Sequence, residues 1–120
     1  QAMLNGGQLD GVRILSRSTV TLMTSDHLGS AINTTINPGM LLLGSQGYTF
    51  GLGFLVRQAD GIAGVHGSAG EFMWAGAAGT FFWAEPKEQT CTVYMSQSPS
   101  PQRAYYRRLL KSEVSQALAD

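Results

Sequence analysis

The stretch EFMWAGAAGTFFWAEP, residues 71–86, decides the fold. Two runs rich in aromatic residues flank a segment with almost no side chain, Ala75 to Gly79. Glycine inside a strand is destabilising by about 0.5–1 kcal/mol relative to alanine, so another body must approach this backbone closely. Either a neighbouring helix packs against it, or a substrate lies along the strand with Trp74 as one wall. The aromatic flanks are typical of a concave apolar site.

Working outward, the residue pattern predicts extended structure over residues 48–97. The runs 48–58, about 70–77, 80–85 and 90–97 are rich in aromatic and β-branched residues. Turn signals at Asp60-Gly61 and at Glu85-Pro86 separate them. In the last run, Cys91, Val93 and Met95 alternate with polar residues, as in a half-buried strand. We expect an antiparallel β-meander of three to four strands.

The clearest helix pattern covers residues 100–118, with Ser100 as cap and Pro101 at the first helical position. Its apolar positions are Tyr105, Leu109, Leu110, Val114, Ala117 and Leu118. The opposite side is basic, and we expect it to be solvated: Arg103, Arg107, Arg108 and Lys111. With this helix packed on one face of the meander, the fold class is α+β.

Residues 1–47 read as a helix end, a short helix and a loop. QAMLNGG is typical of a last helical turn that stops at Asn5, Gly6 and Gly7. Ser16 or Ser18 suits the cap of a short helix over 18–24, and 29–47 reads as a long loop. We therefore expect residues 1–120 to be a single partial domain, the C-terminal piece of a longer protein.

Composition excludes several function classes. Eight basic residues balance eight acidic ones, which gives no reason to expect nucleic acid as a partner. Cys91 is the single cysteine, no apolar run reaches membrane-spanning length, and His27 and His66 have no partner at metal-binding spacing. No phosphate loop is present, so we expect neither metal nor cofactor. The compartment, bacterial cytoplasm or periplasm, stays open.

The same text resembles a known family. MLNGGQLDGVRILSRSTVTLMTSDHL, then YTFGLGF, then WAGAAGTFFWAEPKEQTCTVYMSQ and a terminal helix are similar to the C-terminal portion of serine β-lactamase-like hydrolases. This superfamily includes class C β-lactamases, DD-peptidases and family VIII carboxylesterases. The resemblance implies that the strands belong to the β-lactamase-like α/β sandwich. The Trp-x-Gly-x-x-Gly-Thr strand is its most specific part.

The resemblance also implies roles for residues 74–77. Trp74-Ala75-Gly76 matches the third family signature, Lys-Thr-Gly, which many esterase-like members replace by Trp-x-Gly. Ala77 follows, and its backbone N–H would form half of the oxyanion hole. Ala77 is thus the candidate catalytic residue, and Trp74, Ala75 and Gly76 are candidate substrate-binding residues. Trp in place of Lys favours esterase or acyltransferase chemistry over a β-lactamase.

The other two family signatures, Ser-x-x-Lys and Tyr-x-Asn, are absent, and no Gly-x-Ser-x-Gly elbow replaces them. The resemblance therefore implies a serine hydrolase for the complete protein, acting on a small ester, amide or lactam, and an inactive chain by itself. It also leaves the strand 90–97 as an open edge, through which we expect self-association. The alternative is a stand-alone binding module that docks a peptide by strand addition.

Overall fold

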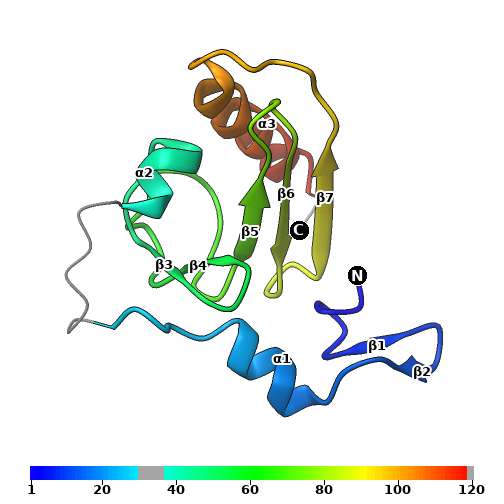
Figure 1. The fold of residues 1–120 in the computed structure, drawn as a ribbon. Helices are drawn as coiled ribbons and strands as arrows, with labels where there is room; N and C mark the ends of the chain where they lie inside the picture. The colour runs from blue at the N-terminus through cyan, green and yellow to red at the C-terminus, as the bar shows by residue number, and fades with distance from the viewer. Residues whose placement is uncertain (30–36, 119–120) are drawn as a thin grey trace.

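A computed structural model describes residues 1–29 and 37–118. Its centre is an antiparallel sheet of five strands in the order β3-β4-β5-β6-β7, so each strand pairs with its neighbour in sequence (Figure 1). The bounds are β3 Tyr48–Phe50, β4 Leu55–Arg57, β5 Phe72–Ala75, β6 Phe81–Glu85 and β7 Thr90–Tyr94. Helix α3, Arg103–Ala117, packs on one face. The predicted α+β class, an antiparallel meander with a C-terminal helix, is confirmed.

The sheet has five strands because the run 48–58 folds back on itself. β3 and β4 form a hairpin, and the N–H of Gly51 donates to the carbonyl of Phe54 across the turn at 2.8 Å. Gly53 has a φ of +85°, which favours glycine. A Cβ at Gly51 would lie 2.2 Å from the carbonyl oxygen of Met23. The predicted extended run 48–58, which these two glycines interrupt, is therefore two strands joined by a turn.

The N-terminal segment forms short elements below the sheet (Figure 1). Residues 1–7 make one helical turn, in which the N–H of Asn5 donates to the carbonyl of Gln1 at 3.0 Å, and Gly6 and Gly7 end it with positive φ. A small hairpin follows, β1 Gln8–Leu9 and β2 Val12–Arg13. Helix α1, Arg17–Met23, begins at Ser16, whose side chain accepts from the N–H of Thr19 at 3.0 Å.

The predicted loop 29–47 contains a helix that the sequence reading missed. Residues 30–36 of that loop lie outside the described residues. Helix α2, Pro38–Leu43, has Pro38 at its first position and Asn37 as its cap, with the Asn37 side chain accepting from the N–H of Met40 at 3.1 Å. Gly44 ends it in the left-handed conformation. Pro38-Gly39 reads as a turn in isolation, but it opens a helix that buries Leu43.

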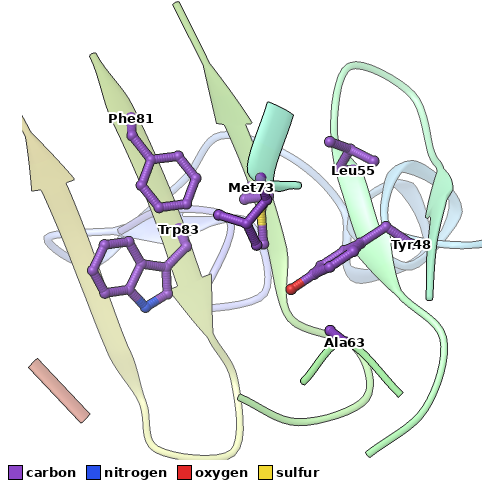
Figure 2. Close-up of a cluster of buried hydrophobic side chains, with 7 residues drawn as sticks. Tyr48, Leu55, Ala63, Met73, Phe81 and Trp83 are labelled. Atoms are coloured by element: carbon purple, nitrogen blue, oxygen red, sulfur yellow. The ribbon is translucent and has the colours of Figure 1, made fainter. Parts of the chain in front are cut away.

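The main hydrophobic core lies between the sheet and α3. Figure 2 shows its side chains together over one face of the sheet, where the rings of Phe81 and Trp83 stack with centroids 5.3 Å apart. Leu110 and Val114 of α3 pack against this cluster. Its buried members are Leu43, Tyr48, Leu55, Ala63, Met73, Phe81 and Trp83. A smaller cluster on the opposite face, built on Val56, Phe72 and Ala84, receives Met3, Leu4 and Phe54.

Helix α3 presents a different side to the sheet from the one expected. Arg107 and Lys111, expected in solvent, are 0% and 1% exposed, whereas Tyr105 and Leu109 are 56% and 43% exposed. The prediction of a solvated basic side was therefore wrong for Arg107 and Lys111, because the sheet offers them oxygen acceptors. The start also differs: Gln102 is the cap residue and makes no side-chain capping bond.

Strand β7 forms one edge of the sheet. It is shorter than the predicted run 90–97, and its exposed side carries Cys91 and Val93, while Thr92 and Tyr94 are half-buried toward α3. Over residues 1–29 and 37–118, no helix combines the length and the apolar character needed to cross a membrane.

Candidate functional site

The candidate site lies on β5, where the strand has a neighbour on one side only. β4 pairs with the first half of β5, through Val56–Phe72 and Leu55–Met73. β6 pairs with β5 over a longer stretch, up to Trp74–Phe82 and Ala75–Phe81. β4 begins at Leu55, directly after the hairpin turn, so no strand among the described residues flanks the second half of β5 on that side. This leaves an open edge from Trp74 onward.

Beyond Ala75 the chain turns, which corrects the expectation of a strand through Ala77. The N–H of Gly76 donates to the carbonyl of Thr80 at 2.9 Å, and the N–H of Gly79 donates to the carbonyl of Gly76 at 3.1 Å. Residues 76–79 are thus a tight turn between β5 and β6. A Cβ at Gly76 would lie 2.3 Å from Oγ1 of Thr80, and Gly79 has a φ of +119°. The small residues serve this turn.

The backbone groups of β5 alternate between its two sides. The carbonyl of Glu71 accepts from the N–H of Arg57 on the β4 side, whereas the N–H of Gly76 faces β6. By alternation, the N–H and carbonyl of Ala75 face the open edge. The carbonyl of Gly76 points inward to Gly79, so the N–H of Ala77, across the same trans peptide, points outward. Within the described residues nothing accepts from the Ala77 N–H.

Trp74 stands beside this edge and is 38% exposed, outside both buried clusters. Its ring meets that of Phe50 edge-on, with centroids 5.5 Å apart. It lines a shallow hollow of about 330 Å³ together with Ala75, Gly76, Thr80, Phe81, Phe82 and Val93. The structure thus brings Trp74, Ala75 and Gly76 together at one hollow over β5, β6 and β7, whereas Ala77, in the turn that follows, does not line it.

Arg107 of α3 reaches the back of this turn, and sequence reasoning missed it. Its Nη2 donates to the carbonyls of Gly76 at 2.6 Å and Thr80 at 3.2 Å, and its Nη1 donates to that of Leu42 at 2.8 Å. Burial, together with the nearby Arg103, lowers the pKa of the Arg107 guanidinium. A sequence signal existed: residues 107, 110, 111 and 114 follow the i, i+3, i+4, i+7 spacing of one helix side.

A second buried polar cluster joins α3 to the start of β5. The carboxylate of Glu71 accepts from Nζ of Lys111 at 2.6 Å and from the hydroxyl of Tyr48 at 3.1 Å, and Nη1 of Arg57 lies 3.8 Å away. Burial raises the pKa of Glu71 and lowers that of Lys111, and the attraction between the two charges opposes both shifts. Their short contact supports the ionised pair, which anchors α3 beside the candidate site.

The described residues contain no group of three metal-ligating side chains close enough to hold a metal ion. The site presents backbone donors beside an apolar wall. Free N–H groups at a fixed position stabilise a negative charge that develops on an oxygen.

Comparison with known proteins places the fold. No protein-family model matches the chain. A 97-residue stretch, 79% of the chain, is 31% identical to two proteins of Mycobacterium tuberculosis, Protein Rv1367c and Uncharacterized protein MT1414. The chain spans 24% of the length of these curated relatives.

Two solved structures are similar in fold. EstCE1, a hydrolase with promiscuous acyltransferase activity, gives a TM-score of 0.71 at 21% identity, over 93% of this chain and 26% of that one. The simvastatin synthase LovD from Aspergillus terreus gives 0.71 at 19% identity, over 99% of this chain and 32% of that one. Both have the β-lactamase-like fold. The chain has the β-lactamase-like fold, and it corresponds to a part of it.

Proposed function

We propose that this chain supplies the oxyanion-binding strand of a β-lactamase-like serine hydrolase, with Ala77 as the backbone donor. The observation that carries the proposal is the open edge of β5, where the outward N–H of Ala77 has no acceptor among the described residues. The fold of EstCE1 and LovD supports the class of reaction. No Ser-x-x-Lys occurs in the sequence, so we propose that the rest of the complete enzyme contributes the nucleophile and its base.

In this proposal the reaction is acyl transfer through a serine ester. The serine oxygen attacks the substrate carbonyl carbon while its proton passes to the base, and the π electrons of the carbonyl move onto the carbonyl oxygen. The Ala77 N–H donates to this oxyanion, together with the N–H of the nucleophile. Collapse of the tetrahedral intermediate expels the leaving alcohol, which takes the proton from the base, and leaves an acyl-serine. Water or another alcohol then gives its proton to the base, attacks the acyl carbon and releases the serine, which takes the proton back.

The hollow beside Trp74 bears on the substrate class. Its side chains are mostly apolar, and none of its seven lining residues carries a charge. A substrate carboxylate would be desolvated there without a partner, which is costly. We therefore propose an uncharged ester as the preferred substrate, and the acyl-transfer chemistry of an esterase or acyltransferase in place of that of a β-lactamase.

The proposal is tested by removing the backbone N–H of Ala77. Ala77 occupies the second position of the 76–79 turn without positive φ, a position that accepts proline. Ala77→Pro in the complete enzyme deletes the N–H, whereas Ala77→Gly keeps it and serves as the matched control. We expect Ala77→Pro to lower kcat for p-nitrophenyl butyrate by about 10²–10³-fold, and Ala77→Gly to stay close to the parent.

Two results would overturn the proposal. One is a complete enzyme that neither hydrolyses p-nitrophenyl esters nor gains mass on incubation with a fluorophosphonate. The other is an Ala77→Pro variant that folds and turns over at the parent rate. The 120-residue chain alone is expected to be inactive toward p-nitrophenyl acetate and nitrocefin, since it has no nucleophile in a family setting.

A further inference from the structure

The side chain of Arg107 is fully buried, yet it faces no carboxylate. Its guanidinium donates to the carbonyls of Leu42, Gly76 and Thr80. The ion pairs of the described residues join Glu71 to Arg57 and Lys111, and do not include Arg107. Its Nε has no hydrogen-bond partner among those residues. Burying a guanidinium on neutral acceptors is costly, so packing alone does not explain why Arg107 lies there.

The geometry of the Gly76–Ala77 peptide supplies that reason. A trans peptide is planar, so its carbonyl and its N–H point in opposite directions. The Gly76 carbonyl is held by two donors, Nη2 of Arg107 at 2.6 Å and the N–H of Gly79 at 3.1 Å. Fixing the carbonyl fixes the plane, and with it the direction of the Ala77 N–H. Arg107 thereby sets this amide from the opposite end of its own peptide bond.

The charge of Arg107 acts in the same direction as its geometry. A cation bonded to a carbonyl oxygen draws electron density through the conjugated amide toward that oxygen. The N–H at the other end then becomes a stronger donor, as in cooperative hydrogen-bond chains. Bonds from a charged donor are also stronger than neutral ones. The contact to Gly76 is the shortest of the three that the guanidinium makes with carbonyls.

We infer that Arg107 is the positioning residue of the oxyanion donor: it orients and polarises the Gly76–Ala77 peptide from behind, so that the Ala77 N–H meets the developing oxyanion. This inference rests on the proposed function, because it assigns a role within that site. Arg107 itself does not touch the substrate.

The test compares Arg107→Lys and Arg107→Met with Arg108→Gln in the complete enzyme. Arg108 follows on the same helix and makes no side-chain hydrogen bond among the described residues, so it is the matched control. Lysine keeps a charge but not the planar fork that spans several acceptors. For both Arg107 variants we expect kcat to fall up to about 10²-fold, the scale for a misplaced catalytic group, with KM nearly unchanged.

Two further readouts separate positioning from general stability. Affinity for a methyl phosphonate that mimics the tetrahedral intermediate should fall in parallel with kcat in the Arg107 variants. In isotope-labelled protein without ligand, the Gly76 carbonyl ¹³C and Ala77 ¹⁵N resonances should shift together in Arg107→Lys and stay in place in Arg108→Gln. If Arg107→Met does not fold, the kcat, the phosphonate affinity and the two resonances of Arg107→Lys test the inference.

Failure of this inference differs from failure of the proposed function. If the parent enzyme is active while folded Arg107→Lys keeps its kcat, its phosphonate affinity and both resonances, the positioning role is wrong. Equal losses of kcat in Arg107→Lys and Arg108→Gln would also overturn it. A parent enzyme without esterase activity overturns the proposed function, and the resonances then still report whether Arg107 holds the peptide.

Discussion

The buried ion pair between Glu71 and Lys111 yields a prediction about the anchor of α3. Lys111→Met keeps most of the apolar stem and removes the ammonium that lies 2.6 Å from the Glu71 carboxylate. Both side chains are nearly inaccessible, at 1% and 0% exposed. The variant therefore leaves a carboxylate in the core without its closest counter-charge.

The magnitude follows from what remains around Glu71. Breaking a buried pair by removing one partner costs about 3–5 kcal/mol. Arg57 lies 3.8 Å from the same oxygen and offsets part of this loss, although its guanidinium already donates to the carbonyls of Ala59, Val65 and His66. We therefore expect the lower end of the range, a loss of about 3 kcal/mol in the free energy of unfolding.

The double variant Glu71→Gln with Lys111→Met provides the control. It removes both charges and keeps an amide oxygen as acceptor for the hydroxyl of Tyr48, which donates to Glu71 at 3.1 Å. Replacing a whole buried pair with neutral groups is often close to neutral. We expect this variant to recover part of the stability that Lys111→Met loses, since Arg57 loses the Glu71 carboxylate but keeps its three carbonyl acceptors.

Urea unfolding of the 120-residue chain, followed by circular dichroism at pH 7, measures both variants. With a slope of about 1–3 kcal/mol per molar urea, a loss of about 3 kcal/mol moves the midpoint by at least about 1 M. A loss below about 1 kcal/mol, the level of an exposed pair, would refute a buried ionised pair. A double variant as unstable as the single one would refute the charge argument.

Three more predictions concern the side chain of Trp74, the stability of the fold at acid pH and the exposed edge strand β7. Trp74→Lys in the complete enzyme should raise kcat/KM for esters that bear a carboxylate relative to neutral esters; unchanged selectivity contradicts a cleft-facing Trp74. The hydrogen bond from the Thr49 side chain, and next those from backbone N–H groups, lower the pKa of Asp26 below its usual 3.8. The ionised carboxylate therefore stabilises the fold above pH 3.8, and this contribution is lost as the pH falls through the lowered pKa. Asp26→Asn should weaken the fall of the urea midpoint between pH 4 and pH 2, and an unchanged dependence of the midpoint on pH would count against this. We propose that the 120-residue chain self-associates through β7, whose exposed Val93 marks the edge; sedimentation should show a dimer that Val93→Lys dissociates, and a parent monomer at all concentrations contradicts it.

Local sequence signals were sufficient for most of the sheet. The aromatic and β-branched runs of β5, β6 and β7, with the turn signal at Glu85-Pro86 between β6 and β7, predict antiparallel strands, and the structure confirms this order. Ser16, one of the two predicted cap residues, likewise begins α1. These features depend on residues that are near one another in the sequence, so they could be predicted from the sequence alone.

Contacts between distant segments decided what the sequence reading missed. Arg107 and Lys111 are polar by type, and the acceptors that receive their side chains in the interior, at Gly76 and Glu71, lie far away along the chain. The sequence predicts a strand through residues 75–79, although the two hydrogen bonds that close the turn there are local, because small residues alone do not distinguish a turn from a strand. The open edge of β5 likewise depends on where β4 begins.

One measurement tests the central claim most directly: a crystal structure of the complete enzyme with a phosphonate bound covalently to its nucleophilic serine. The account predicts a phosphonyl oxygen about 2.7–3.1 Å from the backbone nitrogen of Ala77, with the alkyl chain beside Trp74. A phosphonyl oxygen held by other donors, with the Ala77 N–H turned away from it, would contradict the account.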